Sequence, residues 1–206
     1  MKRKQIVVLA ALGIGAAGCA SIMQGWEDTD AKALAMMRVS FKENGQAKLD
    51  RLNQDEVQRL CSEYVGEKKM PREIAERIER SQMATIKYPD KLLGDWKAGE
   101  RIAQTGVGMQ FSDNPATPNG ANCYACHQLS KAELSFGTIG PPLYNFAKIR
   151  GFTPATEKYA YGKIYNSEAY SACSSMPRFG HSKILTEEQI KDVVALLMDP
   201  NSPVNK

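Results

Sequence analysis

The chain has 206 residues, with 27 Lys and Arg against 23 Asp and Glu and a formal net charge of +4. Three of the basic residues, Lys2, Arg3 and Lys4, lie in an N-terminal segment that we expect to be removed, which leaves 24 basic and 23 acidic residues. So small an excess argues against a nucleic-acid-binding surface, which needs clustered positive charge.

Residues 1–20 have the pattern of a secretory signal peptide. The basic residues are followed by an apolar run from Ile6 to Ala17 and then by small residues suited to cleavage. The run is too short to span a bilayer, so we expect export to the periplasm and no transmembrane span in the mature chain. Cys19 follows Ala-Ala-Gly. It is either the lipid-modified cysteine of a lipoprotein or is discarded by ordinary cleavage near Ala20.

Residues 21–90 are expected to form a charged, helical N-terminal extension. Helical patterns cover 31–37, the segment from Asp55 to Gly66, and a segment that begins at Pro71 and includes Ile74, Ile78 and Met83. Each pattern has too few apolar residues to form a core alone. The extension is therefore either an arm that packs on the rest of the chain or on a partner, or a set of solvated helices.

Residues 91–206 are expected to form the main domain. Helices are predicted from Asp95 to Thr105 and from Pro154 to Tyr165, with loop over 166–184. The last helix follows a capping box at Thr186 and Gln189 and ends at Pro200. No stretch alternates in the way that a strand does, so the predicted class is all-α.

The chemistry of this domain centres on Cys123-Tyr-Ala-Cys126-His127. A Cys-x-x-Cys-His pentad is an attachment site for a c-type haem. The two cysteines form thioethers to the porphyrin, and the adjacent histidine supplies one axial iron ligand. A zinc site would need four close nitrogen or sulfur ligands, and the remaining cysteines and histidine are too scattered. We therefore expect one covalently attached haem c, in a class I cytochrome c-like domain.

Met176 is the preferred sixth ligand of the iron, because it lies in a loop between predicted helices and is followed by Pro177. His181 is the alternative ligand. A Met/His pair raises the reduction potential, and two filled axial positions favour electron transfer. The Pro141 carbonyl is expected to hold the second nitrogen of His127. Arg178 is expected either near a haem propionate or in solvent.

Cys61 and Cys173 are the cysteines left after Cys19 and the haem thioethers are set aside. An exported protein tends to pair such thiols. A bridge would tie the extension to the haem domain and stabilise the fold by about 4–5 kcal/mol on the chain-entropy model. Two buried free thiols are the alternative.

Four stretches together resemble SoxX, the monohaem cytochrome c subunit of the SoxAX complex in bacterial thiosulfate oxidation. They are Gly120-Ala-Asn-Cys-Tyr-Ala-Cys-His127, Gly137-Thr-Ile-Gly-Pro141, Met176-Pro-Arg-Phe-Gly-His181 and the segment from Leu185 to Pro200. The resemblance covers residues 90–206. The haem pentad is common to all c-type cytochromes, whereas the stretch that begins at Met176 is more specific.

The resemblance implies a heterodimer with a SoxA-like cytochrome, acting as an L-cysteine S-thiosulfotransferase. Such a complex joins thiosulfate oxidatively to a cysteine of the SoxYZ carrier. The sulfur chemistry is expected at a cysteine-ligated haem of SoxA. This chain would accept the released electrons and pass them to a soluble cytochrome. The alternatives are a stand-alone monohaem periplasmic electron carrier and, in another class, a haem sensor or scaffold.

Overall fold

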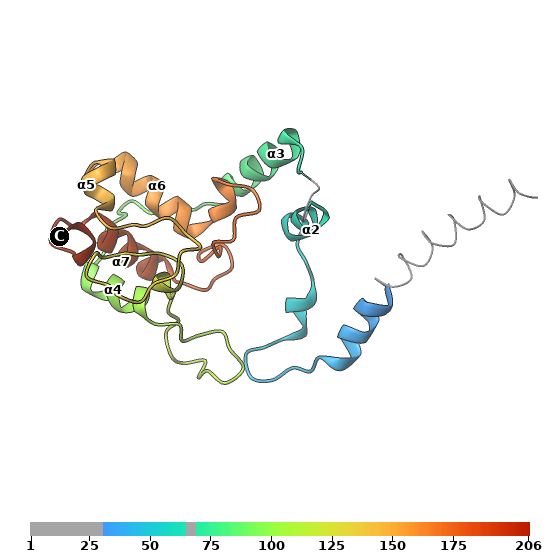
Figure 1. The fold of residues 1–206 in the computed structure, drawn as a ribbon. Coiled ribbons are helices and arrows are strands. Elements are labelled where there is room, and N and C mark those ends of the chain that lie inside the picture. Colours follow the sequence, from blue (N-terminus) through green and yellow to red (C-terminus); the bar gives the residue numbers. More distant parts are fainter. Residues whose placement is uncertain (1–30, 65–68) are drawn as a thin grey trace, which may run out of the picture. The chain divides into compact units, whose positions relative to one another are not determined.

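The computed structural model describes residues 31–64 and 69–206 (Figure 1). The proposed signal peptide and Cys19 lie outside these residues. The chain divides into two compact units, the first covering residues up to 44 together with 48–53, and the second covering 45–47 and 54–206. This division differs from the boundary expected at residue 90, because most of the expected extension belongs to the same unit as the main domain.

The described part of the first unit is short. Residues 31–40 are helical, and Leu49–Leu52 form the 3-10 helix η1. Glu43 connects the two, since its carboxylate accepts a hydrogen bond from the Leu49 backbone N–H at 3.3 Å and pairs with the Lys48 ammonium at 3.3 Å.

The second unit is helical throughout its regular parts, and the described residues form no β-strand. Its elements in chain order are α2 (Glu56–Glu63), α3 (Arg72–Met83), α4 (Trp96–Gln104), η2 (Cys123–Ala125), α5 (Phe146–Arg150), α6 (Pro154–Tyr165), η3 (Ser167–Ala169), α7 (Glu187–Met198) and η4 (Pro203–Asn205). In the described part of the chain, no helix has the length and apolar character needed to cross a membrane.

Polar side chains fix where these helices begin. Asp55 and Gln58 form a capping box at the start of α2, and Thr186 and Gln189 form another at the start of α7. Thr153 caps α6, whose first residue is a proline. Each cap satisfies a backbone N–H that would otherwise lack a partner in the first helical turn.

Helices α4 and α7 cross at close range (Figure 1). A Cβ on Gly99 would lie 2.1 Å from the backbone oxygen of Asp192, so only glycine permits this approach. Two hydrogen bonds join the same segments, from Gly94 N–H to the Lys191 carbonyl at 3.0 Å and from Asp95 N–H to Asp192 Oδ1 at 2.8 Å. The other helices of the main core pack against α7, one of the two crossing helices.

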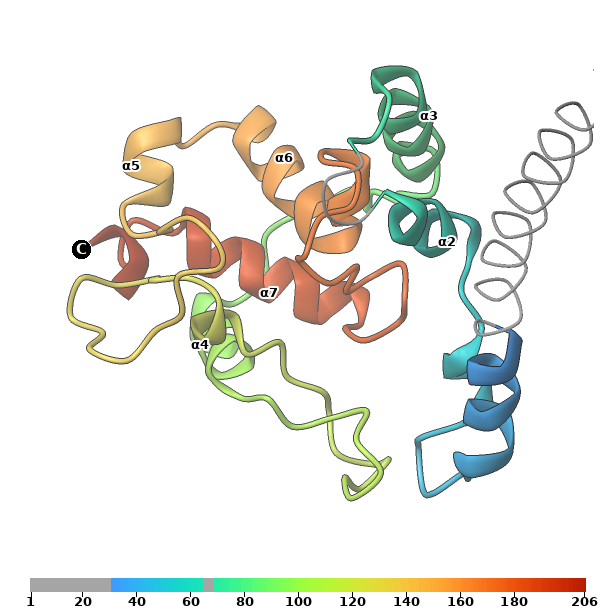
Figure 2. The same cartoon turned by 45° about the vertical axis from the view of Figure 1, so that its right-hand side comes forward.

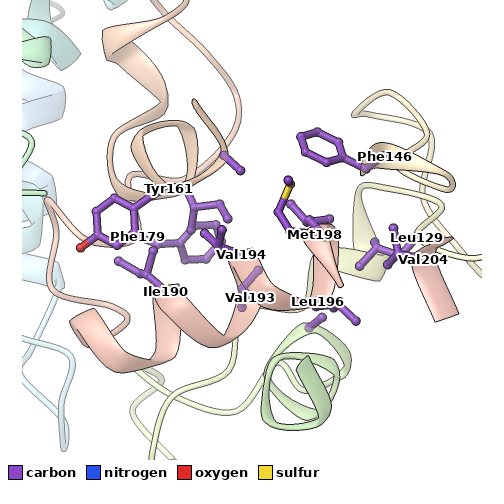
Figure 3. Close-up of a cluster of buried hydrophobic side chains, with 14 of the residues drawn as sticks. Leu129, Phe146, Tyr161, Phe179, Ile190, Val193, Val194, Leu196, Met198 and Val204 are labelled. Carbon is purple, nitrogen blue, oxygen red and sulfur yellow. The ribbon is translucent and has the colours of Figure 1, made fainter. Parts of the chain in front are cut away.

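The main core runs along α7 (Figure 3). Tyr161 of α6, Phe179 and Ile190 lie toward one end of the cluster, and Phe146 of α5 and Met198 lie toward the other. Helix α6, α5 and η4 all pack against α7. A near-continuous buried surface on α7 explains why its sequence is so apolar compared with the other helices.

A second, smaller cluster lies between α2 and α3. Val57, Leu60 and Ile78 are buried there, and Ala172 from the loop after η3 packs against them. Helix α3 also packs against η3 (Figure 2). These two helices therefore share apolar contacts with the segment that precedes Met176.

Candidate functional site

The pentad forms one tight turn. Asn122 has left-handed backbone geometry (φ 46°) and introduces η2. The Cys123 carbonyl accepts hydrogen bonds from the N–H groups of Cys126 at 3.1 Å and His127 at 2.9 Å. Neither Cys123 nor Cys126 takes part in a disulfide. The turn thus presents two cysteine side chains and an imidazole within five residues.

The His127 ring is held in one orientation. Its Nδ1 lies 2.7 Å from the Pro141 carbonyl oxygen. A carbonyl can only accept, so Nδ1 carries the proton and Nε2 keeps a free lone pair for a metal. This is the contact expected from the sequence.

Two glycines of the loop that supplies Pro141 are hydrogen-bonded to the pentad. Gly137 N–H donates to the Tyr124 carbonyl at 2.8 Å, and Gly140 N–H donates to the Cys126 carbonyl at 2.8 Å. A Cβ on Gly140 would lie 2.1 Å from Cε1 of His127. The imidazole therefore occupies space that only a glycine leaves open.

Met176 lies in the irregular segment after η3. Its side chain is half-buried and packs against the main core, as does Cys123. Its carbonyl accepts a hydrogen bond from Ser167 Oγ at 2.5 Å, and its N–H donates to Ser174 Oγ at 3.2 Å. One core thus supports both the pentad and the methionine, whose role as iron ligand stays a prediction.

Arg178 and His181 lie together beside the start of α2. The Arg178 guanidinium, whose side chain is 12% exposed, lies 2.5 Å from Asp55 Oδ2 and 3.4 Å from Gln82 Oε1. Burial and the Arg178 charge lower the pKa of His181, and Asp55 opposes them. The structure gives Arg178 a partner that the sequence did not suggest, and its contact with a propionate stays a prediction.

Cys61 of α2 and Cys173 form a disulfide. It joins the second helix of the chain to the residue three positions before Met176. The sequence had left free thiols as the alternative, and the structure places the two sulfurs together as a bridge.

Several polar residues around this loop were missed by the sequence analysis. Glu79 of α3 accepts a hydrogen bond from Ala172 N–H at 3.2 Å, and Glu168 accepts one from Cys173 N–H at 2.5 Å. Burial raises the pKa of Glu168, although the N–H groups of Cys173 and Ser174 and the Arg178 charge lower it. No local pattern marks such residues, because their partners are backbone groups of an irregular loop.

The donor set fits a haem better than a bare metal ion. Across residues 31–64 and 69–206, no group of three or more His, Cys, Asp or Glu side chains could hold a metal. The oriented imidazole of His127, with the predicted Met176 thioether, would supply two ligands to an iron whose other four ligands come from a porphyrin, and the two cysteines of the turn would bond to the porphyrin edge.

Comparison with known proteins gives the same assignment. The family model described as cytochrome c matches residues 97–199. The chain belongs to the cytochrome c family. The expected all-α, class I cytochrome c-like fold is thereby confirmed, and the family implies a covalently bound haem c and electron transfer.

One relative matches over its whole length. It is an uncharacterized lipoprotein of Aquifex aeolicus (strain VF5), 34% identical over 213 residues, and the match covers 100% of each chain. The similarity therefore includes the N-terminal extension as well as the cytochrome domain. Neither match carries the SoxX name.

Proposed function

We propose that this cytochrome c is the electron-transfer subunit of a SoxAX-type complex, with one haem c attached through Cys123 and Cys126. His127 and Met176 would supply the two protein ligands of the iron. The observation that carries the electron-transfer assignment is the pentad turn with His127 Nδ1 held by the Pro141 carbonyl. The SoxAX assignment depends on the resemblance of the segments around Met176.

The residues of the chain have separable tasks in this function. When bound, haem c supplies a one-electron couple. The Pro141 carbonyl keeps the His127 ring fixed and makes its Nε2 more basic, which favours the ferric state. The Met176 thioether favours the ferrous state and raises the potential. With His127 and Met176 both bound to it, the iron would have no free position for a small ligand.

The covalent cofactor is tested by expression in a host that matures c-type cytochromes. Denatured, acid-washed protein is separated by electrophoresis and stained for haem peroxidase activity. The wild-type band should stain, and a Cys123→Ala/Cys126→Ala variant should not. An unstained wild-type band would refute the proposal. Iron and haem quantification on the same sample gives the number of haems per chain.

The partner is tested by purification of the tagged chain from extracts of the native host. A SoxAX-type subunit should retain a second haem-staining polypeptide in a stable complex. Recovery of a lone monomer that still stains for haem would refute the SoxAX assignment and support a stand-alone periplasmic carrier. The cytochrome assignment itself would survive that result.

We assign the location to the periplasm, with a lipid anchor at Cys19. The support is the Ala-Ala-Gly-Cys pattern together with the lipoprotein relative that matches over the whole chain. The wild-type protein should fractionate with membranes and carry an acylated N-terminal cysteine by mass spectrometry. A Cys19→Ser variant should appear in the soluble periplasmic fraction. Wild-type protein that is cleaved after residue 19 would contradict the anchor.

A further inference from the structure

The segment that carries Met176 has little structure of its own. It follows η3 as turns and bends, and Cys173 within it adopts a positive φ of 59°. It is hydrogen-bonded to Ser167 and Glu168 of η3 and to its own Ser174. An irregular loop with few local contacts opens easily unless other parts of the chain hold it.

Before Met176, the loop is held by both N-terminal helices. The disulfide fixes Cys173 to Cys61 of α2. Glu79 of α3 accepts the Ala172 N–H at 3.2 Å. The Ala172 side chain completes the small apolar cluster formed by these helices. A covalent bond, a charged hydrogen bond and apolar packing therefore meet at two adjacent residues.

After Met176, the same helices hold the loop again. Arg178 pairs with Asp55 at the start of α2, at 2.5 Å, and with Gln82 of α3, at 3.4 Å. Gln82 also accepts a hydrogen bond from Asn166 Nδ2 at 3.0 Å. Asn166 is fully buried at the end of α6. The contacts therefore flank Met176 on both sides, at positions 172–173 and 178.

We propose that α2 and α3 form a brace that positions Met176 against the iron, with Cys61, Glu79 and Asp55 as its positioning residues. The proposal rests on the proposed function, which assigns Met176 as the sixth ligand. A thioether is a weak ligand that external donors displace when the loop swings away. The brace reduces the fraction of molecules in which the loop is open, and external ligands bind to that fraction. The N-terminal helices thus have a task within the cytochrome itself.

The test measures imidazole affinity of the purified ferric holoprotein. Imidazole displaces the methionine, and the weak sulfur-to-iron absorption band disappears as it binds. The apparent affinity rises in proportion to the open fraction of the loop. This readout reports the position of Met176 independently of any electron-transfer activity.

Two single variants and their matched controls give the sharpest comparison. Asp55→Asn removes the charge that pairs with Arg178 while asparagine still caps α2. Its control is Glu56→Gln on the same helix, which contacts Arg77 at 3.9 Å. Glu79→Ala removes the acceptor of the Ala172 N–H, and its control is Glu76→Ala, which pairs with exposed arginines on α3.

Each brace variant should raise imidazole affinity about fivefold, the effect of one lost ion pair for Asp55→Asn and of one lost hydrogen bond for Glu79→Ala. Each control should stay within about twofold of wild type. A Cys61→Ser/Cys173→Ser variant should raise the affinity at least about tenfold. If that variant does not accumulate, the single variants decide the question. Equal affinities in brace variants and controls would overturn the proposal.

Met176→Ala separates this inference from the proposed function. If the variant retains the sulfur-to-iron band, Met176 is not the ligand, and the proposed ligand set fails together with the brace. If it loses the band but the brace variants bind imidazole like wild type, the ligand assignment stands and the brace alone is refuted.

Discussion

Gly140 is the position where the smallest addition should have the largest effect on the iron. Its φ lies outside the left-handed region, so alanine suits the backbone, and the conflict is purely steric. A Cβ would lie 2.1 Å from Cε1 and 2.4 Å from Nδ1 of His127. Ordinary contact begins at 3.4 Å, so the ring must withdraw by about 1.3 Å. A displacement of that size breaks the 2.7 Å contact between Nδ1 and the Pro141 carbonyl.

The size of the expected effect on the haem follows from the steric conflict and from the lost hydrogen bond to His127. An overpacked site typically costs about 1–3 kcal/mol, and a lost support of a metal-bound histidine weakens metal affinity about 10–100-fold. Less basic imidazole favours the ferrous state, so the reduction potential should rise. A tenfold change in the ferric-to-ferrous preference corresponds to about 59 mV for one electron. Gly140→Ala should therefore shift the potential upward by about 60 mV or more.

The assay is spectroelectrochemical titration of purified holoprotein, with haem content measured on the same samples. Gly106→Ala is the control, because the nearest atoms to its Cβ would belong to the Asn122 side chain, at 3.1 Å and beyond, and not to His127. We expect the control to match wild type. If Gly140→Ala also keeps the wild-type potential and haem content, then the His127 ring is not confined by this glycine, and the geometric reasoning about its support is wrong.

Three further predictions concern stability. Thr186→Ala removes the cap of α7 and should lower the free energy of unfolding by about 1 kcal/mol in denaturant titrations, with an unchanged midpoint as the contrary result. Leu196→Ala leaves a cavity at a fully buried position and should cost about 2–5 kcal/mol in the same assay, so a loss below 1 kcal/mol would contradict the described packing. Burial and the Arg178 charge lower the pKa of His181 from 6.5. The unfolded chain therefore binds the proton more readily, and stability should fall as the pH drops below about 6.5. Burial alone would raise the pKa of Asp55, but its hydrogen bonds lower it from 3.8, so a further loss should occur below about pH 4. His181→Gln should remove only the loss of stability that begins near pH 6.5. If variant and wild type lose stability with pH in the same way, His181 is not the group responsible.

Local signals in the sequence identified most of the helices. The capping box at Thr186 and Gln189 and the proline at position 154 marked the starts of α7 and α6, and both lie where expected. Pro71 proved to be the cap of α3 and not its first residue. Such signals work because a cap or a proline acts on a backbone only a few residues away.

The arrangement around Met176 could not be predicted in the same way. Arg178 and Asp55 are 123 residues apart in sequence, and Glu79 is 93 residues from Ala172. From the sequence, Arg178 was expected near a haem propionate, as a charge-assisted donor, or in solvent, and no local pattern pointed to Asp55. It treated α2 and α3 as an extension because each lacks a core of its own. Their apolar residues become a core only when the distant loop is added.

The α4–α7 crossing also determines when the domain can fold. Gly94, Asp95 and Gly99 meet their partners across a separation of about a hundred residues, as in the 97-residue span from Asp95 to Asp192. Contacts between residues so far apart in sequence form slowly, because the chain must close a long loop before it gains any stabilisation. Until α7 has been synthesised, α4 lacks the helix with which it shares most of its packing. The pentad lies between these two helices in sequence, so we expect its turn to be packed in the folded domain only after the last helix has been made.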